Sequence, residues 1–232
     1  MFETIAWISL GIAFFCSIVI AVDVVRHPQK MNVMNVVWPV TALYGSVFAL
    51  WAYFRIGRKK AKDAQQEMSE EQHKKMMKEA KEHPKPSQTG VAASHCGAGC
   101  TLGDIVADFA VFGFALTLWG SDLWASFVID YILAWLLGIV FQYFTIAPMR
   151  GISGWEGIWA AIKADTLSIT AWQLGMYGWM LLTYFVIFPH PHLQPNQAGY
   201  WFMMQFAMIA GFFTAYPMNY ILVKTGLKEA MA

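Results

Sequence analysis

The sequence predicts an all-α integral membrane protein with about six transmembrane helices. The 232-residue chain is 57% hydrophobic and only 13% charged, whereas a soluble domain is about 25% charged. Six segments approach the roughly 20 apolar residues that a helix needs to cross a bilayer, and one short region holds most of the charge. A soluble globular domain is therefore excluded. The net charge of +1 gives no indication of a nucleic-acid partner.

The six predicted spans follow from apolar runs along the chain, at residues 4–25, 33–54, 105–120, 123–147, 166–188 and 200–223. The third run is the shortest, and it reaches span length only if it starts near Asp104 and includes Asp108. The chain accordingly divides into a two-helix N-terminal part (1–57), a polar charged loop and linker (58–94), and a four-helix part (95–228). A lipid bilayer is the first partner that this division predicts.

The distribution of Lys and Arg predicts the orientation in the membrane. If both termini are cytoplasmic, fourteen of the sixteen Lys and Arg residues fall on the inner side, ten of them in the loop between the second and third spans. Cytoplasmic loops are enriched in these residues. We therefore expect a multi-pass protein of the inner (cytoplasmic) membrane, with both termini and the polar loop inside.

One short run gives the main indication of function. A histidine, two cysteines and a carboxylate fall within ten residues, in His95-Cys96-Gly97-Ala98-Gly99-Cys100-Thr101-Leu102-Gly103-Asp104. Residues four apart lie on one face of a helix, and this spacing relates Cys96, Cys100, Asp104 and Asp108. Thiolates and imidazole suit copper and zinc, and buried carboxylates carry protons or harder ions. The sequence therefore predicts a metal site of His95 and these four residues at the cytoplasmic mouth of the third helix.

Glycine leaves a second geometry open for this run. Gly97, Gly99 and Gly103 each weaken a helix by about 1 kcal/mol relative to alanine, so a loop or a broken helix is the alternative. Gly99 and Gly103 also form a pair of small residues that would let a neighbouring helix approach closely. A packing role for the cysteines, and a helix-capping role for the aspartates, remain alternatives to metal binding.

Other candidate residues lie outside this run. In the predicted topology His27, His190 and His192 face outward, where they and nearby methionines are possible outer-face metal contacts; a Pro/His-rich turn and ordinary packing are the alternatives. Asp130 and Asp165 are intramembrane ionisable groups, which normally face a bundle interior or pair with one another.

Several classes of protein are disfavoured by absent signatures. The sequence has no P-loop, GxSxG or HExxH motif, and no flavin signature. No histidine lies deep in a predicted span, which disfavours a haem held by two histidines. A transporter or binding protein is therefore favoured over an enzyme, with copper or zinc as the possible cofactor.

The run from His95 to Asp104 resembles the HCGAGCxLGD signature of an uncharacterised bacterial family of multipass membrane proteins, defined only as a domain of unknown function. The stretches 26–31, 37–44, 147–151 and 163–168 are similar to the same family. The resemblance implies an integral membrane protein and supplies no assigned activity. Some members are labelled copper-related, which points the same way as the thiols.

The leading functional prediction is transport or handling of a soft transition metal, copper first, through the site on the third helix. The absence of an ATP motif predicts passive or proton-coupled movement, or dependence on a partner. A membrane thiol-disulfide oxidoreductase is the first alternative, although the thiols are separated by three residues rather than the two of thioredoxin-like sites. An accessory subunit of a larger membrane complex, or a homo-oligomer, is the other.

Overall fold

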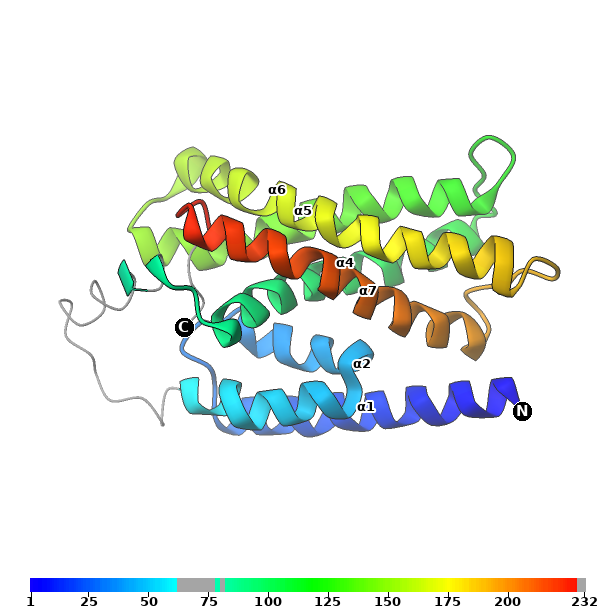
Figure 1. Ribbon diagram of the computed structural model, residues 1–232, viewed down its shortest axis with the longest axis horizontal. Coiled ribbons are helices and arrows are strands. Elements are labelled where there is room, and N and C mark those ends of the chain that lie inside the picture. The colour runs from blue at the N-terminus through cyan, green and yellow to red at the C-terminus, as the bar shows by residue number, and fades with distance from the viewer. Residues whose placement is uncertain (62–77, 80–81, 229–232) are drawn as a thin grey trace.

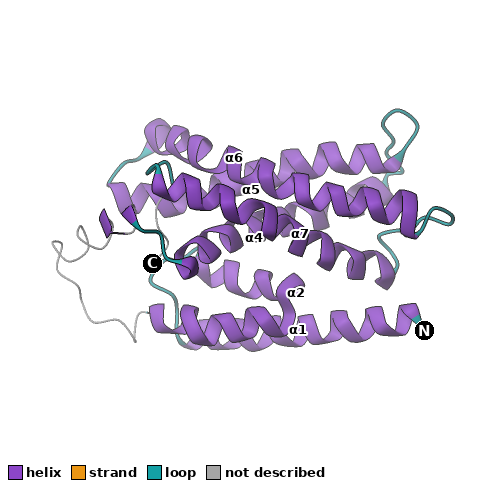
Figure 2. Cartoon of the chain, in the orientation of Figure 1, coloured by secondary structure: helices purple, strands orange, loops and turns teal. Residues whose placement is uncertain are grey.

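The computed structural model describes residues 1–61, 78–79 and 82–228, which form a bundle of long helices (Figures 1 and 2). About half of the predicted polar loop, residues 62–77 and 80–81, lies outside this part. The α-helices are α1 (Phe2–Arg26), α2 (Met34–Ala52), α4 (Pro86–Gly113), α5 (Asp122–Arg150), α6 (Gly154–Leu182) and α7 (Ala198–Lys224). Short helical turns at Tyr53–Gly57 and Thr183–Ile187 extend α2 and α6. The described residues contain no strand, and the all-α prediction is confirmed.

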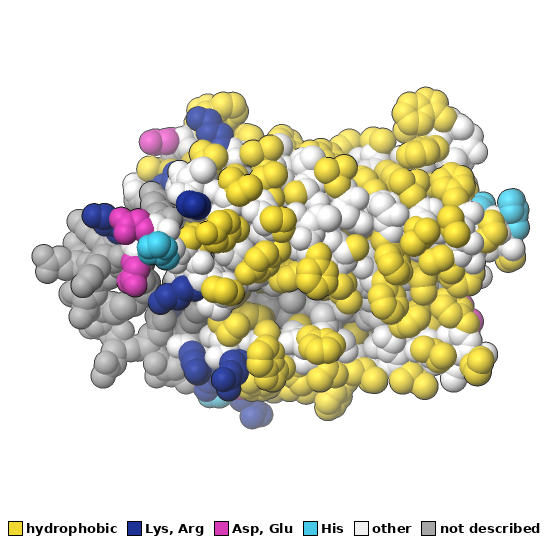
Figure 3. Space-filling model, viewed as in Figure 1, with side chains coloured by type: hydrophobic (Ala, Val, Ile, Leu, Met, Phe, Trp, Pro, Cys, Tyr) yellow, Lys and Arg dark blue, Asp and Glu magenta, His cyan; other side chains and the backbone are white. Residues whose placement is uncertain are grey.

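The surface matches a bilayer environment. Many large apolar side chains are exposed, among them Trp7, Phe48 and Phe213. Figure 3 shows such side chains over most of the visible face, with Lys and Arg gathered at one end. Within the described residues, five helices are long and apolar enough to cross a membrane. The exception is α6, whose first half carries Glu156, Lys163 and Asp165.

The second apolar segment is a helical hairpin rather than a straight span, although its length and hydropathy would suffice for one. Its backbone reverses at Ser46, where φ is 47° and ψ is −127°. Trp38 and Tyr53, on opposite sides of the reversal, have ring centroids 5.5 Å apart, whereas a straight helix would separate them by about 22 Å. Gln29 before the hairpin also pairs with Ala61 after it. The hairpin therefore enters and leaves at the same end of the bundle (Figure 1).

This hairpin changes the predicted arrangement of the termini. Phe2 packs against Phe188, in the turn before α7, with ring centroids 5.0 Å apart, and a side chain added at Gly199 would meet Phe2. The chain therefore starts at the end of the bundle where α7 begins, opposite the end where α7 finishes (Figure 1). The prediction that both termini lie on the same side is wrong for this fold, because the hairpin removes one crossing.

The two ends of the bundle differ in charge. At the charged end, where α1 finishes and α4 begins, Asp23 pairs with Arg58 at 3.2 Å and with His27 at 3.1 Å. His27 was predicted at the outer face with His190 and His192; it lies instead at this charged end, because α1 runs in the opposite direction to the one predicted. The opposite end, where α4 finishes and α7 begins, is called the far end below.

The third long helix begins earlier than predicted. α4 starts at Pro86, where a proline at the first turn fits a helix start, and continues without a break to Gly113. The boundary expected near residue 95 and the span expected at 105–120 are therefore corrected, and the segment 86–94 is helix rather than linker. The His95–Asp104 run lies inside α4 because its glycines are held by packing against neighbouring helices.

Two of these glycines allow α4 and α5 to approach closely. A Cβ added at Gly103 would lie 2.7 Å from the backbone nitrogen of Ala134, and one at Gly99 would lie 3.4 Å from that of Gly138. This close contact confirms the prediction that the small-residue pair serves helix packing. It also positions the rest of α4, because a larger residue at Gly103 would push the two helices apart.

Candidate functional site

The predicted stripe of thiols and carboxylates exists as a buried line on α4. Cys96, Cys100, Asp104 and Asp108 each have 0% exposure, and the helix that carries them packs against α5, α6 and α7. From Cys96 to Asp108 the line covers about 18 Å of helix axis. It runs from the charged end of the bundle toward the far end.

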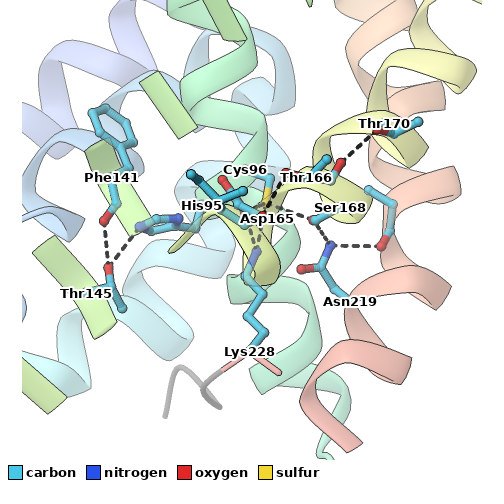
Figure 4. Close-up of polar contacts among 12 residues, drawn as sticks. His95, Cys96, Phe141, Thr145, Asp165, Thr166, Ser168, Thr170, Asn219 and Lys228 are labelled. Carbon is cyan, nitrogen blue, oxygen red and sulfur yellow. Dashed lines mark hydrogen bonds and ion pairs between the residues drawn. The ribbon is translucent and has the colours of Figure 1, made fainter. Parts of the chain in front are cut away.

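At the charged end, Cys96 belongs to a polar cluster, which we call the thiol cluster: Cys96, Asp165, Ser168 and Lys228. Cys96 Sγ lies 2.9 Å from both Asp165 Oδ1 and Ser168 Oγ, two atoms of α6. Lys228 Nζ donates hydrogen bonds to Cys96 Sγ at 2.8 Å and to Asp165 Oδ1 at 2.9 Å. Asn219 of α7 donates to Ser168 Oγ at 2.7 Å. Figure 4 shows the ammonium beneath the thiol and the carboxylate.

Lys228 is the residue of this cluster that sequence reasoning missed. It lies just beyond α7, and the bond from its backbone nitrogen to Leu222 O, 3.0 Å, turns the chain back toward the bundle. The side chains of Lys228 and Asp165 both have 0% exposure. Burial alone would lower the pKa of Lys228, but the nearby Asp165 and Cys96 raise it above its ordinary value. The cluster therefore favours the charged form of this fully buried lysine.

His95 does not join Cys96 in this cluster. Its Nε2 lies 3.1 Å from Thr145 Oγ1 on α5, and its ring packs edge-on against Phe141. Nδ1 is buried and has no hydrogen-bond partner. Figure 4 shows the imidazole pointing toward Thr145, away from Lys228. Consecutive residues on a helix point about 100° apart, which explains why His95 and Cys96 face different neighbours.

Deeper in the bundle, three carboxyl groups lie near one another. Asp104 and Asp108 of α4 are within electrostatic range of Asp130 of α5, which is only 2% exposed. Both oxygens of Asp104, both of Asp108 and one of Asp130 are buried with no partner at strict hydrogen-bond distance. Gln173 lies near Asp104, and Ser126 and Tyr200 lie near Asp108. In the described part of the chain, Asp165 is the one buried aspartate in an ion pair.

A small cavity reaches Asp108 and Asp130 from the far end. Its volume is about 40 Å³, and Asp122, Gln194 and Pro195 line it near the far-end loops. A cavity of this size has room for a few water molecules or one ion. The buried line on α4 therefore continues into a space that begins where α5 starts and α7 is about to start.

The remaining predicted residues do not converge with the stripe. His190 and His192 lie in the far-end loop with ring centroids 5.2 Å apart, and His192 stacks on Tyr184 at 3.6 Å. Among the described residues, no three His, Cys, Asp or Glu side chains come together closely enough to hold a metal ion. The copper or zinc site of the sequence analysis stays a prediction.

Fold and site together define an α-helical membrane protein with a line of ionisable residues inside its bundle. Comparison with known families places residues 87–228 in a family described as "Domain of unknown function (DUF4396)". The chain belongs to that family, and the matched region runs from the start of α4 to Lys228. No curated protein and no solved structure matches the chain.

Proposed function

We propose that this protein transports a soft transition-metal cation, copper first, across the inner membrane through the bundle of α4, α5, α6 and α7. The observation that carries the proposal is the buried line on α4, which leads from the thiol cluster past Asp104 to the far-end cavity at Asp108. The two thiols and then the two carboxyl groups of this line would offer a cation successive ligands along most of the bundle.

The energetics of burial support a transport role over simple packing. Ionisable side chains inside a membrane are costly, and those that persist usually mark ion or proton pathways. No partner lies within strict hydrogen-bond distance of any carboxyl oxygen of Asp104 or Asp108. Polar side chains are nearby, Gln173 beside Asp104 and Ser126 and Tyr200 beside Asp108, but none carries a positive charge that would offset a buried carboxylate. A bound proton or metal cation would compensate it.

At the charged end, the Lys228 ammonium occupies the position that the transported metal cation would need. This ammonium lies between Cys96 Sγ and Asp165 Oδ1, where a metal bound to both would have to sit. Metal binding at this point therefore requires Lys228 to withdraw, and its return after release would keep Asp165 neutralised. The second oxygen of Asp165 is buried and unpartnered, which leaves a ligand available.

The distribution of charge supports an orientation for this movement. The charged end carries Arg26, Arg58, Arg150 and Lys224, and the positive-inside rule therefore favours a cytoplasmic position for it. The thiol cluster would then be the cytoplasmic exchange point, and the cavity at Asp108 would open to the outside. Protons on Asp104 and Asp108 would provide coupling in the absence of an ATP motif.

The test is metal flux in proteoliposomes that contain the purified full-length chain. We expect uptake of Ag(I), a stable analogue of Cu(I), at a rate well above that of empty vesicles. The double variant Cys96→Ser/Cys100→Ser and the single variant Asp104→Asn should each lower the rate at least tenfold. Cys16→Ser is the matched control, because Cys16 is a buried thiol of α1 outside the line. Flux equal to that of empty vesicles would refute the proposal.

A thiol-disulfide oxidoreductase is a second candidate, favoured by the Lys228 ammonium 2.8 Å from Cys96 Sγ. A neighbouring cation favours the reactive thiolate, although complete burial and the Asp165 carboxylate 2.9 Å away oppose it. Thiol trapping across a series of redox buffers separates the two functions. A defined midpoint potential for Cys96 and Cys100, together with no metal flux, would favour redox activity.

A further inference from the structure

The far-end cavity is lined by methionine side chains as well as by aspartates. Three methionine side chains, Met176 and Met180 of α6 and Met204 of α7, line the same 40 Å³ space as Asp108 and Asp130. Their exposures are 0%, 5% and 4% respectively. Met176 and Met180 are four residues apart on α6, and the fold brings them to the same cavity as the aspartates.

The carboxyl groups of the cavity need a positive partner. Asp108 is fully buried and has only the neutral hydroxyl groups of Ser126 and Tyr200 nearby, neither within strict hydrogen-bond distance. Asp130 is 2% exposed, and its Oδ1 has no hydrogen-bond partner. An isolated buried carboxylate is strongly unfavourable, so each must hold a proton or face a cation. One monovalent metal ion and one proton would neutralise the pair.

The donor types select the class of cation. Thioether sulfur is a soft ligand that favours Cu(I), and three thioethers contribute no charge of their own. Hard divalent cations are less suited, because Ca²⁺ takes about six to eight oxygen ligands and Mg²⁺ demands a near-ideal octahedron of oxygens. Apart from Asp122, which is partly exposed near the far-end loops, the space is lined by two buried carboxyl groups and three methionine side chains, a set that fits a soft monovalent ion better.

We propose that Met176, Met180 and Met204, with Asp108 and Asp130, form a binding site for a soft monovalent metal ion at the far end of the bundle. The site is separate from the thiol cluster, which lies about 18 Å of helix axis away. It rests on the proposed function for the biological identity of the ion, but binding itself can be tested without transport. The carboxylates would attract the ion and the thioethers would discriminate against harder cations.

The experiment measures Ag(I) binding to the full-length chain in detergent, with all three cysteines replaced by Cys16→Ser, Cys96→Ser and Cys100→Ser. Without thiols, we expect about one Ag(I) per chain by equilibrium dialysis and mass spectrometry. Met176→Leu/Met180→Leu should weaken this binding at least tenfold, and Asp130→Asn, which preserves shape, should do the same. Met34→Leu is the control, since Met34 is a buried methionine of α2 outside the cavity.

Two results would overturn the inference: no Ag(I) bound by the cysteine-free chain, or unchanged binding in both cavity variants. If the cysteine-free chain does not fold, the same variants in the wild-type background should each lose one bound ion, and retention of every ion would overturn the site. Failure here is distinguishable from failure of transport. A chain that binds Ag(I) without flux refutes the proposed function alone, and flux without this binding refutes the far-end site alone.

Discussion

The ion pair between Lys228 and Asp165 gives a quantitative prediction for stability. The variant Lys228→Met keeps an unbranched side chain one atom shorter and removes its charge. It leaves the Asp165 carboxyl group, 0% exposed, without the ammonium that now lies 2.9 Å away. Removing one partner of a buried ion pair costs about 3–5 kcal/mol, whereas replacing both partners is often neutral. We expect Lys228→Met and Asp165→Asn each to destabilise the protein by this amount.

The assay is thermal unfolding in detergent, arranged as a double-mutant cycle. A loss of about 1 kcal/mol lowers Tm by roughly 2–4 °C in a chain of 150–250 residues, so each single variant should unfold about 6–20 °C earlier. The double variant Asp165→Asn/Lys228→Met should recover most of that loss. Lys224→Met is the control, because Lys224 is an exposed lysine at the end of α7. Single variants that unfold within a degree or two of wild type, or a double variant no better than the singles, would refute the reasoning.

Three further predictions concern the fold. Gly103→Ala should destabilise the protein by about 1–3 kcal/mol in the same assay, because overpacking pushes α5 away. Gly90→Ala is the control and should not destabilise it, since nothing lies within 4 Å of the added carbon. Equal effects of the two substitutions would contradict the close contact. Ser46→Gly should raise stability by up to about 1 kcal/mol, since glycine accepts a φ of 47° without strain, and a clear loss would contradict the hairpin reversal. In intact cells expressing a cysteine-free chain, an impermeant maleimide should label Glu3→Cys but reach Lys30→Cys only after permeabilisation; the reverse pattern would contradict the orientation.

Local pattern was enough to predict the helical class and the stripe. Apolar runs near 20 residues need no knowledge of neighbours, and a four-residue spacing places Cys96, Cys100 and Asp104 on one face wherever a helix forms. The burial of that face agrees with the prediction. Helix geometry also predicts the separation of His95 from Cys96, because consecutive helical residues point in different directions.

Two features depended on contacts that sequence spacing does not reveal. The hairpin at Ser46 has the composition of a span, and only the packing of Trp38 against Tyr53 shows that its arms are side by side. Lys228 reaches Asp165 across 63 positions of the chain. Its place after the last predicted span therefore predicts a positive charge but not the ion pair. The cavity likewise joins α4, α5, α6 and α7, which no single segment predicts.

The hairpin also bears on how the chain is inserted into the membrane. Since both of its arms meet the charged end, the basic residues around it never have to be translocated. The connections that reach the far end, residues 114–121 and 188–197, contain no Lys or Arg at all. In the proposed orientation the side chains that cross with a formal charge are the acidic Glu3 and Asp122. A membrane potential that is negative inside would favour their outward movement by about 2.3 kcal/mol per charge per 100 mV. In this orientation the membrane potential would therefore assist the translocation of these acidic side chains during insertion.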